Sequence, residues 1–178
     1  MKNKKVLFLT QAAAIAALYF VLTWLASMLG LSSGAIQVRF SEALTILPFF
    51  TPAAIPGLFI GCLLSNFLTG AVVWDVVFGS IATLIGAVGT YALRKTGIKW
   101  LAPLPPIVAN TVIVPWVLRL AYGVPDALWY LVLTVGAGEI ISCGILGMIL
   151  FGALDKYKKA LFSVIEYGLN EKHHQLKI

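Results

Sequence analysis

The chain has 178 residues, of which 60% are hydrophobic and only 11% are charged, and its mean hydropathy is +0.95. Soluble domains average about 25% charged residues, so these side chains cannot cover a water-soluble globule. The composition excludes that class and predicts an all-α membrane protein. The net charge of +6 comes from basic clusters between apolar segments, a pattern typical of a membrane protein rather than of nucleic-acid binding.

Six apolar segments follow one another, and each is predicted to be a helix. Their ranges are 6–29, 41–50, 52–68, 75–93, 104–120 and 126 or 128 to 154. The second is too short to cross a bilayer unaided, and Pro48 is predicted to bend or end it. Irregular backbone at that depth needs protein or a water-filled cavity around it. Asp75 is the predicted N-cap of the fourth helix.

Basic residues predict which ends of the segments face the cytoplasm. Three clusters stand before the first segment, after the fourth and after the sixth. They are Lys2, Lys4 and Lys5; Arg94, Lys95 and Lys99; and Lys156, Lys158 and Lys159. With six crossings all three lie on one side, so both termini are predicted to be cytoplasmic. The expected organisation is a single six-helix transmembrane domain, residues 1–155, with a cytoplasmic tail, residues 156–178.

Two polar side chains fall near the bilayer midplane when residues are counted from the helix ends. They are Glu139 in "VGAGEIISCG" and Asn110 in "PPIVANTVIVPW". A charge at that depth costs about 2.5–3.5 kcal/mol on insertion scales, so both are predicted to face a common cavity. Two simpler interpretations stay open. Asn110 could only bond a neighbouring helix, and Glu139 could be a protonated carboxyl bonded to backbone.

Arg39 and Glu42 stand three residues apart in "QVRFSEALTILPFF", directly before the apolar run. That spacing suits a partnership across one helical turn. One interpretation is a partly buried ion pair that fixes the start of the second segment. The favoured one is a polar lid over the pocket that Asn110 and Glu139 define.

The sets of residues that carry out enzymatic chemistry, such as Ser-His-Asp or Cys-His, are not found in the sequence. Cys62 and Cys143 stand alone, without metal-ligand spacing, and are predicted to pack inside helices. There is no nucleophile with a base, no phosphate-binding motif and no metal set, so the chain is predicted to be neither an enzyme nor an ATPase.

Small residues recur every four positions in the first segment. Ala12 and Ala16 form one pair, and Ala13 and Ala17 form another. Such stripes allow close helix contact, either with an internal neighbour or with another protein.

Three stretches carry a resemblance to a known family over residues 11–154. "QVRFSEALTILPFFTPAAIPGLFIGC", "WDVVFGSIATLIGA" and "GAGEIISCGILG" resemble the QueT family of queuosine-precursor transporters. These are S components, the substrate-binding subunits of energy-coupling factor (ECF) transporters. The resemblance implies capture of a 7-deazaguanine outside a prokaryotic plasma membrane. It also implies docking on a T component and two cytoplasmic ATPases that consume ATP, while this chain needs no cofactor.

The resemblance also assigns roles to residues. Glu139 would accept the two adjacent N–H groups of a guanine-like edge, and Asn110 would bond the ring. Trp116, with Tyr122 or Trp74 as alternatives, would stack on the base. The remaining predicted site residues are Gln37, Arg39, Glu42, Asp75 and Arg119. The alanine stripe of the first helix, Ala12 with Ala16 or Ala13 with Ala17, would contact the T component.

Two other functions remain open from the sequence. The chain could be an S component for a different vitamin, such as riboflavin or thiamine. It could also be a structural or assembly protein of the membrane, in which Asn110 and Glu139 only join helices.

Overall fold

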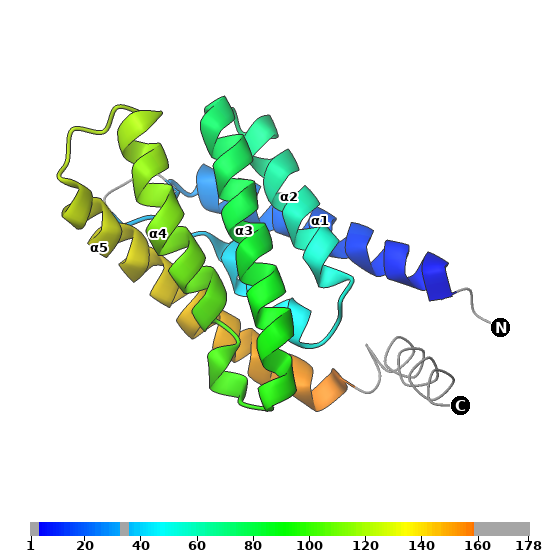
Figure 1. Cartoon of the computed structure of the whole chain (residues 1–178). Helices are drawn as coiled ribbons and strands as arrows, with labels where there is room; N and C mark the ends of the chain where they lie inside the picture. Colours follow the sequence, from blue (N-terminus) through cyan, green and yellow to red (C-terminus); the bar gives the residue numbers. More distant parts are fainter. Residues whose placement is uncertain (1–3, 33–35, 159–178) are drawn as a thin grey trace, which may run out of the picture.

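The computed structural model describes residues 4–32 and 36–158, and within those ranges every regular element is a helix (Figure 1). The α-helices are α1 (Lys4–Met28), α2 (Ala54–Leu68), α3 (Val73–Leu93), α4 (Leu104–Leu120) and α5 (Leu128–Glu139). A 3₁₀-helix, η1 (Phe40–Phe49), precedes α2, and two 3₁₀ turns, η2 (Arg94–Thr96) and η3 (Lys99–Leu101), connect α3 to α4. After α5 the same helix continues through a π-helical stretch, η4 (Ile140–Leu146), to Lys158.

In the part of the chain that the structure describes, four helical stretches are long and apolar enough to cross a membrane. They are Lys4–Met28, Val73–Thr96, Lys99–Leu120 and Leu128–Lys158. Two apolar helices, η1 and α2, are shorter. The architecture is therefore that of a multi-pass, all-helical membrane protein, while the count of six crossings stays a prediction.

The predicted segments agree with the helices to within a few residues, except at one cap. The fifth, 104–120, coincides with α4. Asp75 is not the N-cap of α3, because that helix begins at Val73 and Val72 occupies the cap position. Pro48 lies inside η1, close to its end. Of the predicted tail, residues 159–178 lie outside the described part of the chain.

The first helix packs closely on α2 through small residues. An added Cβ at Gly57 would meet the backbone oxygen of Ala12 at 2.7 Å, and one at Gly61 would meet the backbone of Ala16 at 3.0 Å. Ala12 and Ala16 are buried in this contact, whereas Ala13 and Ala17 are exposed. The two alanine pairs therefore face different surroundings, because successive helical residues point about 100° apart.

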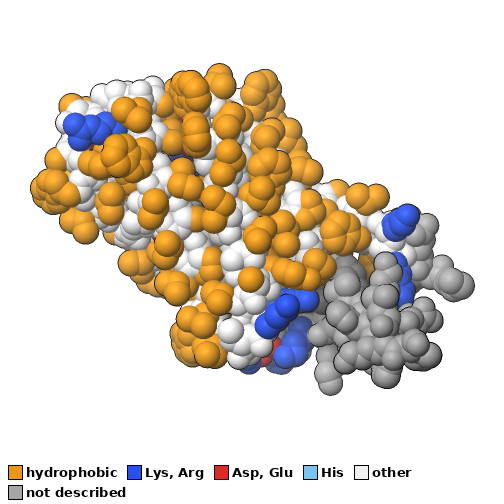
Figure 2. Space-filling view, viewed as in Figure 1, with side chains coloured by type: hydrophobic (Ala, Val, Ile, Leu, Met, Phe, Trp, Pro, Cys, Tyr) orange, Lys and Arg blue, Asp and Glu red, His pale blue; other side chains and the backbone are white. Residues whose placement is uncertain are grey.

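Apolar side chains fill the centre and also cover the outside. The core includes Tyr19, Ile46 and Leu58, and the rings of Phe49 and Phe50 pack on Phe151 with centroids 5.1 and 4.7 Å away. Figure 2 shows apolar side chains over most of the visible face, with basic ones gathered mainly toward one end. An outer surface of this kind is suited to lipid rather than to water.

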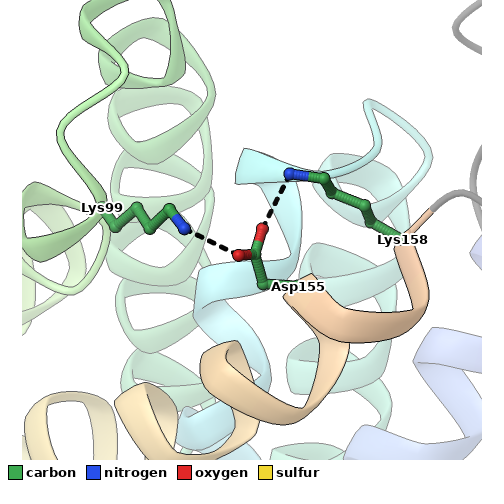
Figure 3. A network of polar contacts seen from close by, with 3 residues as sticks. All are labelled: Lys99, Asp155 and Lys158. Carbon is green, nitrogen blue, oxygen red and sulfur yellow. Dashed lines mark hydrogen bonds and ion pairs between the residues drawn. The ribbon is translucent and has the colours of Figure 1, made fainter.

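At one end of the bundle, two of the predicted basic clusters come together. The Nζ atom of Lys99, in η3, lies 2.6 Å from Asp155, and that of Lys158 lies 2.9 Å from the same carboxylate (Figure 3). The turn after α3 and the end of the last helix therefore share one end of the molecule. This contact is compatible with the predicted common side for these clusters.

Candidate functional site

The short helix η1 carries Glu42 into the interior of the bundle. Every residue from Ser41 to Pro48 is buried, and Glu42 is 3% exposed. This 3₁₀-helix is thus covered by protein, as its irregular backbone requires. The hydroxyl of Tyr19, on α1, donates a hydrogen bond to Oε1 of Glu42. One turn along α1, the hydroxyl of Thr23 donates to Oγ of Ser41 at 2.8 Å, so two hydrogen bonds fix η1 against α1.

The last helix brings a second carboxyl group to the same place. Glu139 ends α5, and the π-helix η4 begins at the next residue. Short π-helical stretches inside α-helices occur often at functional sites. The thiol of Cys143, within η4, donates to Oε2 of Glu139 with the two atoms 3.1 Å apart. The Cys143 sulfur also lies 3.5 Å from the backbone oxygen of Glu42, so the two acidic segments touch.

A small cavity lies between these segments and the long helices. Its lining residues are Gln37, Arg39, Glu42, Gly79, Thr83, Asn110, Val114, Val135 and Glu139. Its volume is about 20 Å³, which is room for about one water molecule. The structure thus brings five of the predicted site residues to one cavity, with Asn110 beside both carboxyl groups.

The cavity holds an acceptor without a protein partner. Oε2 of Glu42 is buried and receives no hydrogen bond from the described residues. Ligand atoms of Glu42, Glu139 and Cys143 all lie within 4.8 Å of one another, close enough to share a cation. The site is therefore rich in acceptors and suits a ligand that brings N–H donors or positive charge.

Arg39 does not pair with Glu42 as the spacing suggested. Within the described residues no ion pair joins them at 4 Å or less, and the Arg39 guanidinium also lies within the electrostatic influence of Asp75. The reason is local, because Arg39 has an extended backbone (φ −111°, ψ 111°) and stands before the helix rather than inside it. Its backbone N–H donates to Oγ of Ser142 at 3.2 Å. The interpretation as a mutual ion pair is wrong, and Glu42 forms a buried wall of the cavity rather than part of a lid.

Asp75 lies in the first turn of α3, where negative charge is favourable at the helix N-terminus. The hydroxyl of Tyr122 donates to its Oδ2 at 2.9 Å and accepts from the backbone N–H of Val72 at 3.3 Å. Tyr122 thereby links Asp75 to the backbone at the start of α3. Burial raises the pKa of Tyr122, and the charge of Asp75 adds to the effect.

A larger cavity lies next to the first and shares two lining residues with it. Its volume is about 270 Å³, and its lining residues are Gln37, Leu118, Val124, Asp126, Tyr130, Leu131, Thr134 and Val135. Gln37 borders both cavities, and its backbone oxygen presses on Gly138 so closely that a Cβ there has no room. The segment around Gln37 therefore separates the two spaces.

Four aromatic and basic candidates, Trp74, Trp116, Arg119 and Tyr122, are not among the residues that line either cavity, and neither is Asp75. Trp116 is 51% exposed on α4, and Arg119 is exposed near the end of that helix. Trp74 is exposed and stacks on Phe78, with ring centroids 5.9 Å apart. None of these side chains is among the lining residues of either cavity.

Sequence reasoning missed Tyr19, Ser142 and Cys143. A signal for Tyr19 was present, because it stands three residues after Ala16 and so shares the inward face of α1. Ser142 and Cys143 follow Glu139 at helical spacing, which places them on its face of the helix. Their contacts with Arg39 and Glu42 join residues more than 100 positions apart, and no local pattern indicates them.

Comparisons with known proteins agree with the resemblance found in the sequence. A family model described as "QueT transporter" matches residues 9–156. A curated relative, "Queuosine precursor transporter QueT" of Lactococcus lactis subsp. cremoris (strain MG1363), is 40% identical over 85 residues. The alignment covers 48% of this chain and 50% of the relative, so the chain spans about half the length of the relative it matches. No solved structure matches the chain.

Proposed function

We propose, because this chain belongs to the QueT transporter family, that it is the substrate-binding S component of an ECF transporter for queuosine precursors. Membership of a transporter family supports a transport role rather than an enzymatic one. The name of the Lactococcus lactis relative supports the substrate class, 7-deazaguanines. Cyano- and aminomethyl-deazaguanine and the free base queuine all belong to this class.

One observation carries the proposal: two carboxyl groups on one buried cavity, with an acceptor oxygen that no described residue satisfies. A guanine-like edge offers two adjacent N–H donors, the ring N1–H and the exocyclic amine. A carboxylate accepts both at once in a charge-assisted pair. Glu139 is assigned to that edge and Asn110 to the ring carbonyl or a ring N–H. Glu42 is placed to accept a further donor or an ammonium group.

Binding requires the site to enlarge. A cavity of about 20 Å³ cannot hold a bicyclic base, whereas the adjoining one measures about 270 Å³. Displacement of the segment around Gln37 would merge the two. In this proposal Gln37 and Arg39 close over the bound base, and Asp75 holds Arg39 electrostatically. In this proposal the small cavity at the carboxyl groups, about 20 Å³, belongs to a closed state that opens to admit the base.

The partners proposed are a T component and two cytoplasmic ATPases, in a prokaryotic plasma membrane with both termini inside. The exposed pair of α1, Ala13 and Ala17, is the free surface for the T component. The pair Ala12 and Ala16 packs against α2 and is therefore not available for that contact. ATP is used by the ATPases and not by this chain.

Uptake measurements test the proposal. A queuosine-auxotrophic strain that expresses this chain with its T component and ATPases should accumulate 7-deazaguanines. Ala17→Leu should block uptake while the purified protein still binds ligand, because it adds bulk only on the exposed face. The matched control is Leu18→Ala, on the neighbouring exposed position, which removes bulk and should retain uptake. Absence of uptake of every deazaguanine, with the protein present in the membrane, would contradict the proposed function.

A further inference from the structure

Each carboxyl group of the site is held by a donor that is not part of the cavity lining. The Tyr19 hydroxyl donates to Oε1 of Glu42, and the Cys143 thiol donates to Oε2 of Glu139 at 3.1 Å. Neither Tyr19 nor Cys143 is among the lining residues. The two donors come from α1 and η4, elements that are far apart in the sequence.

Both donors are fixed by burial. Tyr19 is 1% exposed and Cys143 is fully buried. The hydroxyl of Thr45 donates to the Cys143 sulfur at 3.4 Å, which restricts the thiol further. Because the side chains cannot swing away, each hydrogen bond fixes the rotation of one carboxyl group.

The two carboxyl oxygens of Glu42 have different surroundings. Oε1 is engaged by Tyr19, while Oε2 has no hydrogen-bond partner among the described residues. Glu139 has the same arrangement in outline, with Oε2 engaged by Cys143. In each residue one carboxyl oxygen therefore accepts from a buried donor that is not among the lining residues of the cavity.

We propose that Tyr19 and Cys143 are positioning residues, which engage one oxygen of each carboxyl group and so present the other to the ligand. This inference rests on the proposed function, because it names what orients the acceptors of that same site. A carboxyl group that is already oriented loses less conformational entropy when a ligand binds, so removal of either donor lowers affinity. The ligand itself touches neither residue.

A double-mutant cycle in the purified, ligand-free protein tests the first contact without reference to any substrate. Tyr19→Phe, Glu42→Gln and the double variant are compared by their unfolding temperatures. Coupling is expected, so the double variant should lose less than the sum of the single losses. Additive losses would overturn the positioning role of Tyr19.

A binding series then tests the consequence, with 7-aminomethyl-7-deazaguanine as the probe in titration calorimetry. Tyr19→Phe and Cys143→Ala should each weaken binding about tenfold, the effect of about one hydrogen bond. Cys143→Ser keeps a donor and should restore most of the affinity that Cys143→Ala loses. Thr90→Val is the matched control, because it removes a buried side-chain hydrogen bond, from Thr90 to the backbone oxygen of Ala102 at 2.8 Å, that involves neither η1 nor the cavity lining. Its affinity should equal that of the wild type.

The outcomes separate the two proposals. If the wild type binds and Tyr19→Phe or Cys143→Ala binds equally well, the inference fails while the proposed function stands. Equal weakening by Cys143→Ser and Cys143→Ala would also overturn it, since the effect would then come from packing. If the wild type binds no deazaguanine, the proposed substrate is wrong, and the ligand-free cycle alone decides the contact between Tyr19 and Glu42.

Discussion

Acidic residues have opposite surroundings at the end of the bundle and in its interior: the first is paired with cations, and the others are not. At the end, Asp155 lies between Lys99 and Lys158, with both ammonium groups within 2.9 Å of its carboxylate (Figure 3). In the interior, Glu42 and Glu139 share one cavity, and the described residues place no lysine or arginine nitrogen within 4 Å of either.

The difference separates an acid that the protein already pairs from two acids that the proposed function assigns to the ligand. Asp155 needs nothing further, because two cations satisfy it at a site open to water. Buried carboxyl groups without a cation reduce stability, since burial removes hydration and returns little. A fold that tolerates two of them on one cavity is suited to a partner that arrives from outside the chain.

Among the variants that test this comparison, Glu139→Gln should change a measured property most, by lowering the affinity for the ligand. The amide keeps an acceptor but loses the charge, so affinity for 7-aminomethyl-7-deazaguanine should fall about tenfold or more. Titration calorimetry of the purified protein measures it. Asp155→Asn, which removes an acid that already has its cations, is the control and should bind like the wild type. Unchanged affinity in Glu139→Gln would remove this residue from the site.

Gly138→Ala tests how tightly the wall of the cavity is built. The new methyl group would collide with the backbone oxygen of Gln37, and overpacking of this kind costs about 1–3 kcal/mol. The unfolding temperature should therefore fall. Gly152→Ala lies on the same continuous helix with nothing within 4 Å of the new Cβ, so its stability should equal or exceed that of the wild type. Equal unfolding temperatures for the two variants would contradict the close contact.

Asp155→Asn should have a smaller effect on stability. It weakens the links from the last helix to Lys99 and to Lys158, and exposed ion pairs of this kind are weak. The unfolding temperature should fall less than in Gly138→Ala. Because salt screens such pairs, the difference from the wild type should shrink at high ionic strength. A loss that does not respond to salt would mean that Asp155 contributes through packing.

Trp116→Ala should have the smallest effect on ligand affinity. The sequence predicted a stacking role, but the structure leaves this ring exposed on α4 and away from the cavity lining. Affinity for 7-aminomethyl-7-deazaguanine should therefore match that of the wild type. A clear loss would show that α4 turns Trp116 inward when ligand binds.

Sequence patterns were informative where hydrophobicity acts directly. Apolar runs indicate helices by themselves, so the range 104–120 matched α4. Counting from helix ends placed Asn110 and Glu139 at similar depth, and the structure has both on one cavity. Depth depends only on helix rise, which is nearly constant.

Sequence patterns did not predict the outcome where packing decides between two arrangements that fit the same pattern. The alanine stripes of α1 predicted close contact, but not that Ala12 and Ala16 would meet glycines of α2 while Ala13 and Ala17 stayed outside. The separation of Arg39 from Glu42 depends on where η1 begins. The contacts of Glu42 with Tyr19 and Cys143 join residues that are 23 and 101 positions apart in the sequence, so local spacing carries no information about them.

The contact between α1 and α2 has a mechanical consequence. Gly57 and Gly61 form notches in α2 that receive Ile15 and Tyr19 of α1, so the two helices interlock. The same face of α1 is tied to η1 by the hydrogen bonds of Tyr19 and Thr23. A larger residue at either glycine would push α1 away from α2 and thereby strain both of these hydrogen bonds at once.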